Sequence, residues 1–113
     1  MTPHLENKLK AEIRKLVSNA KAILTNQIGF PLGVSKMHTL IVYINQIEPI
    51  TNINFSVVNE YLSKIDGCPI GSERLQWEKE ALKKQDKIID EATYYYKDRI
   101  VDTCFHIINL LNN

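Results

Sequence analysis

The chain of 113 residues is poor in the features that mark secreted, membrane and nucleic-acid-binding proteins. Its two cysteines, Cys68 and Cys104, are too few for a disulfide framework, so we expect reduced thiols and a cytoplasmic protein. No apolar run approaches the roughly twenty residues that cross a bilayer, and the first residues lack the apolar core of a secretion signal. A net charge of +1 argues against direct binding of nucleic acid through a large positive field.

Motifs for metal, phosphate and cofactor binding are also missing. The three histidines and two cysteines follow no CxxC, HxxxH or HExxH spacing. Gly67 and Gly71 lack the Lys-Ser/Thr pair that follows a phosphate-binding glycine loop. Cys104 falls between Ile100 and Ile107 on the expected buried side of a helix, where a thiol nucleophile would be inaccessible. We therefore expect no metal, no cofactor and no catalytic set, and predict that the protein is not an enzyme.

What the sequence does have is helical periodicity, with apolar residues three, four and seven apart in four segments. The first segment runs from Leu5 to Ile28, with Thr2 and Pro3 as its N-cap and first residue and Gly29 and Pro31 as its stop. The second follows Gly33 and ends at Pro49, and the third covers about Asn54 to Ile65.

The fourth segment is the longest. It begins at Ser72 or, more in keeping with its spacing, near Lys79, and runs to about Asn112. If Glu78 is the N-cap, Trp77 and Leu82 can form a hydrophobic staple. The sequence thus predicts a single all-α domain over residues 1–113, a bundle of about four helices with a long C-terminal helix, as a monomer or a homodimer.

One side of this long helix carries a stripe of polar residues. Tyr95, Arg99, Asp102 and His106 fall within about 60° of one another on a helical projection, and Asp102 is positioned to hold the His106 imidazole. The spacing Arg99-x6-His106 resembles the Arg-x4–6-His element of HEPN-type RNases, although Ile100 replaces the polar residue that usually follows the arginine. That resemblance implies an RNase whose Arg and His from two subunits meet at a dimer interface.

Acidic residues gather in the same region. Residues 48–113 hold eleven acidic against eight basic residues, whereas residues 1–47 hold two against six. On the long helix the acids are Asp86, Asp90, Glu91, Asp98 and Asp102, with Tyr95 among them. Such a surface can steer a basic protein and then anchor on an aromatic ring.

The loop before the long helix carries a second resemblance. The pattern Ile65-Asp66-x3-Ile70-Gly71-x2-Arg74-x2-Trp77-x2-Glu80-Ala81-Leu82-x3-Asp86-x2-Ile89 resembles a bacterial family of small all-helical proteins of uncharacterised function. The match spans about Ala20 to Asp98 and departs from the family at Cys68-Pro69-Ile70. The family is similar to orphan immunity proteins encoded beside toxins in contact-dependent growth inhibition systems.

The resemblance implies a protein that binds and neutralises a cognate bacterial toxin, such as a nuclease, by protein–protein contact. The candidate partner-binding residues are Arg74, Trp77, Asp90, Tyr95, Asp98, Arg99, Asp102 and His106. Two of them have a purely structural alternative, in which Arg74 braces the loop by hydrogen-bonding its carbonyls and Trp77 packs on the start of the long helix. A HEPN-like RNase and a non-catalytic helical adaptor remain the alternative functions.

Overall fold

The computed structural model describes residues 1–112, and every regular element in that range is helical. Four α-helices form the bundle: α1 (Pro3–Leu24), α2 (Phe30–Ile47), α3 (Ser56–Lys64) and α4 (Lys79–Leu111). A short 3₁₀ helix, η1 (Ser72–Gln76), precedes α4. The predicted all-α class, the helix number and the long C-terminal helix are confirmed, and of the two predicted starts for that helix, Lys79 is the correct one.

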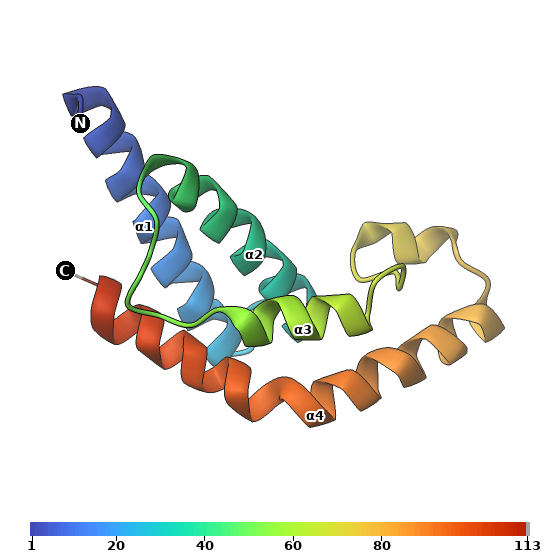
Figure 1. The fold of residues 1–113 in the computed structure, drawn as a ribbon. Helices are drawn as coiled ribbons and strands as arrows, with labels where there is room; N and C mark the ends of the chain where they lie inside the picture. Colours follow the sequence, from blue (N-terminus) through green and yellow to red (C-terminus); the bar gives the residue numbers. More distant parts are fainter. Residues whose placement is uncertain (113) are drawn as a thin grey trace.

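Helix α4 is the spine of the molecule. Its 33 residues correspond to about 50 Å, close to the longest dimension of the protein, 51 Å. The helix is bowed, with the other helices on its concave side (Figure 1). Its amino-terminal third extends past α3 and lies beneath the loop that carries η1 (Figure 1). None of the helices in the described range is long and apolar enough to cross a membrane.

The predicted end of the first helix at Ile28 is wrong, because α1 ends at Leu24. Asn26 adopts a left-handed conformation with φ of 58°, and its N–H donates to the carbonyl of Ile23 at 3.3 Å. The N–H of Gln27 donates to the carbonyl of Ala22 at 2.9 Å. This pair of bonds is a Schellman motif, which ends a helix before any Gly or Pro is needed.

The predicted start of the second helix after Gly33 is also wrong. Gly29 is the N-cap of α2 and Pro31 lies in its first turn, where the fixed φ of proline favours a helix start. Gly33 therefore lies inside the helix, where it allows α2 to approach α1 closely. A Cβ atom on Gly33 would lie 2.6 Å from Cγ1 of Ile23. The buried Asn19 amide donates to the carbonyl of Gly33 at 2.9 Å and joins the two helices.

The core lies where the four helices meet, and aromatic rings join three of them. Tyr61 of α3 is fully buried, with its ring edge-on to Phe30 of α2 at 5.4 Å and to Tyr96 of α4 at 6.2 Å. Its hydroxyl shares a 2.8 Å hydrogen bond with Thr93, and burial raises the pKa of the phenol. The largest fully buried side chains besides Tyr61 are Leu16, Met37, Ile44, Ile100 and Ile107.

Candidate functional site

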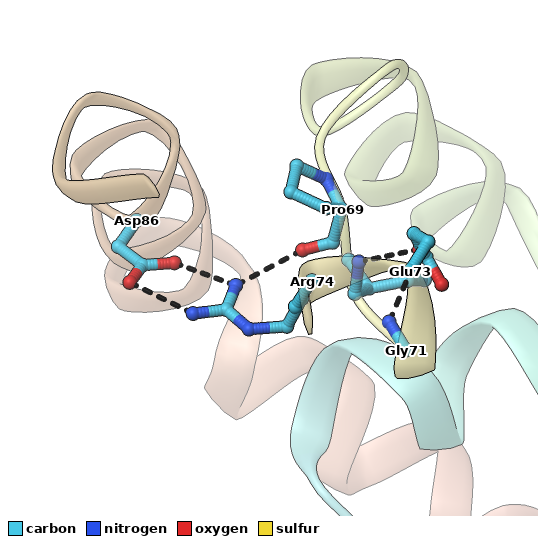
Figure 2. A network of polar contacts seen from close by, with 6 residues as sticks. Pro69, Gly71, Glu73, Arg74 and Asp86 are labelled. Carbon is cyan, nitrogen blue, oxygen red and sulfur yellow. Dashed lines mark hydrogen bonds and ion pairs between the residues drawn. The ribbon is translucent and has the colours of Figure 1, made fainter. Parts of the chain in front are cut away.

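The loop before α4 is fastened to the helix by Arg74. One guanidinium nitrogen of Arg74 donates to Asp86 at 2.8 Å and to the carbonyl of Pro69 at 3.0 Å, and the other donates to the second Asp86 oxygen at 3.0 Å (Figure 2). The paired hydrogen bonds hold the pKa of the Asp86 carboxyl below its usual value. We call this contact the Arg74 clasp. The structural role predicted for Arg74 is confirmed, since it binds a loop carbonyl.

A second carboxylate shapes the same loop from within. Oε1 of Glu73 accepts hydrogen bonds from the backbone N–H groups of Ile70 at 2.9 Å and Gly71 at 3.1 Å (Figure 2). These bonds, with that of Ile70 the largest contribution, lower the pKa of Glu73. The loop is therefore pre-organised, and it exposes two apolar residues, Leu75 at 87% and Trp77 at 38%. Glu78 is the N-cap of α4, and its side chain makes no capping hydrogen bond.

The predicted stripe on α4 lies beside α3. Helix α3 runs antiparallel to the middle of α4 (Figure 1). Two hollows line α4 here, one beside Lys64 at the end of α3 and one beside residues 52–57 at its start. Together we call them the α3–α4 groove. Tyr95 lines the first hollow, and Arg99, Asp102 and His106 line the second. The structure therefore brings the four stripe residues into one surface.

The first hollow, the apolar end of the groove, has a volume of about 410 Å³. Ala92 and Tyr96 are the buried part of its lining, and Ile88 and Tyr95 are exposed by 44% and 70%. Lys64 and Glu91 complete the lining. Exposed apolar side chains around a hollow are what a protein–protein contact uses as anchors.

The second hollow, the polar end of the groove, has a volume of about 350 Å³. Helix α4 contributes Arg99, Asp102 and His106, and the segment that leads into α3 contributes polar side chains. The latter are Asn52 and Asn54, and Ser56, the first residue of α3, adds its hydroxyl. Within residues 1–112 no hydrogen bond or ion pair joins Asp102 to His106, so the predicted carboxylate–imidazole contact is not formed.

An ion pair crosses the groove between its two ends. The Arg99 guanidinium lies 3.3 Å from the Glu60 carboxylate of α3, and both side chains are half-exposed. Arg99 also lies 5.7 Å from the centre of the Tyr96 ring, within the range of a cation–π contact. Its positive charge is therefore already matched by a partner inside the protein.

The acids of the predicted polar side of α4 have different surroundings in the structure. Asp86 is held by Arg74 on the side of the loop, and Asp90 lies near the Tyr61 hydroxyl, whose pKa it helps to raise. Asp98 is exposed but lines neither hollow of the groove. Among the acids of α4, Glu91 lines the apolar end of the groove and Asp102 lines its polar end.

Sequence reasoning missed both the α3 side of this groove and a larger hollow elsewhere. A groove of about 810 Å³ between α1 and α2 is lined by Arg14, Lys15 and Lys36, among others. Lys15 is paired with Glu12 at 3.1 Å. The excess of basic residues in the first 47 positions was the available signal for this basic surface.

Neither thiol is poised for chemistry, and no cluster of potential metal ligands is present in residues 1–112. Burial raises the pKa of the Cys104 thiol to about 11, and burial is also the main cause of a raised pKa at Cys68.

No protein-family model, curated protein or solved structure matches this chain. The two resemblances drawn from the motifs therefore stay predictions.

Proposed function

We propose that this protein is a non-catalytic inhibitor of the immunity type, which neutralises a protein toxin by binding it through the α3–α4 groove. The observation that carries the proposal is the alignment of Ile88, Tyr95 and Asp102 along one open surface. An exposed apolar anchor beside polar side chains is the usual composition of a protein-binding hot spot. The toxin as partner follows from the immunity-protein resemblance.

The partner surface should be basic where it meets the polar end of the groove. Asp102 carries an unpaired carboxylate there, while the positive charge of Arg99 is matched by Glu60. A basic toxin would be attracted to this end, and its association rate should fall as salt rises, because salt screens charges at the rim of an interface.

The test is a calorimetric titration of the protein with the product of a toxin gene adjacent to its own. Tyr95→Ala should weaken binding on the order of 30-fold, the effect of losing about 2 kcal/mol at a hot spot. Tyr94→Ala is the matched control, because Tyr94 is the neighbouring ring, is 92% exposed and lines neither end of the groove. The Tyr94→Ala variant should bind the toxin with an affinity within about threefold of that of the unmodified protein.

A pair of double variants separates the groove from the other acids. Tyr95→Ala with Asp102→Ala should abolish protection of cells from the toxin, whereas Asp90→Ala with Asp98→Ala should preserve it. The proposal is wrong if no heat is detected at micromolar concentrations, or if the Tyr95/Asp102 variant protects cells fully.

One observation keeps the RNase function as a second candidate. Arg99 and His106, seven residues apart on α4, line the same hollow, as an Arg–His pair that acts on one substrate would have to. The pairing of Arg99 with Glu60 and the nearby Asp102 carboxylate both disfavour a phosphodiester at this place. Cleavage of RNA by the purified protein, lost in both Arg99→Ala and His106→Ala, would establish this activity.

A further inference from the structure

The two ends of the α3–α4 groove differ in chemistry, and the difference specifies what an occupant must present. The apolar end is lined by Ile88, Ala92, Tyr95 and Tyr96, with Lys64 and Glu91 as its two charged residues. Such a hollow accepts an apolar side chain, since every Å² of apolar surface removed from water contributes about 25 cal/mol.

The polar end carries an exposed negative charge that forms no ion pair with a described residue. Asp102 makes no hydrogen bond and no ion pair with any described residue. The guanidinium of Arg99, by contrast, is engaged by Glu60 at 3.3 Å. The side-chain oxygens of Asn52 and Ser56, which line the same hollow, are further acceptors. A guanidinium or ammonium group, with several N–H donors and a positive charge, is therefore complementary to this end.

The distance between the ends is set by α4. Ala92 lies in the lining of the apolar end and Thr103 in that of the polar end, eleven residues further along the helix. Eleven residues of helix correspond to about 16 Å. On a second helix laid along the groove, side chains eleven residues apart also point to nearly the same side, because three turns take about 10.8 residues.

From this geometry we propose that the occupant of the groove is an amphipathic helix of the partner protein. It carries an apolar residue and, eleven positions away on the same side, an arginine or lysine that binds Asp102. A helix fits because α4 forms one wall of both ends of the groove, so that a second helix can pack lengthwise against it as in a bundle. This inference rests on the proposed function and names the partner segment that the groove recognises.

The first experiment maps small probes onto the protein by amide chemical shifts. p-Cresol should shift the amides of Ile88, Ala92 and Tyr95, and n-propylguanidinium those of Ser56 and Asp102. Both should bind with dissociation constants on the order of 10 mM, as expected for fragments of this size. Asp102→Asn should abolish the amide shift changes caused by n-propylguanidinium and leave those caused by p-cresol. The control Asp98→Asn should change neither set.

A second experiment tests the spacing with a helical alanine-rich peptide of about twenty residues. The version with Phe and Arg eleven positions apart should bind at least tenfold more tightly than one with nine, because nine positions place the two side chains on opposite sides. Equal affinities of the two peptides would overturn the proposed spacing.

The choice of a cation is overturned if the guanidinium shifts survive in Asp102→Asn, or if butyrate binds the polar end instead. Binding of the anion there would favour the RNase function. The probe experiments and the toxin titration test different claims, so either can give a negative result without the other. If the probes do not bind but Tyr95→Ala still weakens toxin binding, the proposed function stands and this inference falls. If the probes bind as expected but no toxin does, the groove recognises another basic helix.

Discussion

The side of α4 that faces the core and the side that lines the groove should respond very differently to truncation. Ile100 and Ile107 are fully buried, and alanine at either position removes three carbon atoms from the core. At about 0.8 kcal/mol for each buried carbon the transfer loss is about 2.4 kcal/mol, and the cavity left behind adds to it. Each variant should therefore lose about 3 kcal/mol of stability.

Truncation of the groove residues on the same helix should change the free energy of unfolding little. Arg99 forms a half-exposed ion pair with Glu60, and such pairs contribute about 0.2–1 kcal/mol. His106 is exposed and makes no hydrogen bond within the described residues. Arg99→Ala and His106→Ala should therefore each cost less than about 1 kcal/mol.

Urea unfolding measures this contrast. With a slope of about 1.5 kcal/mol per molar, a core variant should lower the midpoint by about 2 M, and a groove variant by less than about 0.7 M. Equal slopes for all variants are the control that the unfolded state is unchanged. If the groove variants lost as much as the core variants, the assignment of the two sides of α4 would be refuted.

Two further predictions concern the helix contact and the clasp. Gly33→Ala should lower the free energy of unfolding by about 2 kcal/mol, because the new Cβ would lie 2.6 Å from the buried Ile23 side chain. Gly29→Ala is the control and should lower it by less than about 1 kcal/mol, because no atom lies within 4 Å of the new Cβ. Thermal unfolding of both variants makes the comparison. In the Arg74 clasp, the hydrogen bonds from Arg74 lower the pKa of Asp86 in the folded protein. The clasp therefore stabilises the fold fully above pH 3.8, the ordinary pKa of aspartate, and this stabilisation is lost as the pH falls through the lowered pKa. Asp86→Asn should therefore lower the melting temperature at neutral pH, and this difference should shrink in acid; a difference that persists unchanged would contradict the clasp.

The elements that could be predicted from the sequence are those fixed by local periodicity. The apolar spacing of Ile89, Tyr96, Ile100 and Ile107 gave the buried side of α4, and the same projection placed Tyr95 and Asp102 together on another side. Both follow from 3.6 residues per turn and need no knowledge of the other helices.

The boundaries between α1 and α2 could not be predicted in the same way. Gly29 and Pro31 were interpreted as a stop, although they begin the next helix. The residue that ends α1 is Asn26, one of the few non-glycine types that adopt the left-handed conformation with little strain. Asn at this position is a weaker signal than the Gly and Pro a few residues later, so the spacing rule favoured the wrong end.

The sequence of α4 could not show which of its charged residues are paired, because their partners lie in distant parts of the chain. Asp86 is twelve residues from Arg74, and Glu60 is 39 residues from Arg99. No helical projection of α4 contains either partner, so all its acids looked equally available to a binding partner. Only the folded chain distinguishes Asp86, which is paired, from Asp102, which is not.

Both arginines among the candidate binding residues turn out to be engaged within the protein. Arg74 joins the loop to α4, and Arg99 joins α3 to α4, so each positions a surface and has its charge matched before a partner arrives. A guanidinium that is already paired attracts a new anion less strongly, because the carboxylate beside it offsets its charge. In the function that we propose, recognition falls to Tyr95, which is 70% exposed although its ring packs edge-on against Tyr96, and to Asp102, which forms no ion pair with a described residue. We therefore expect the groove to prefer a basic, amphipathic partner to an anionic one.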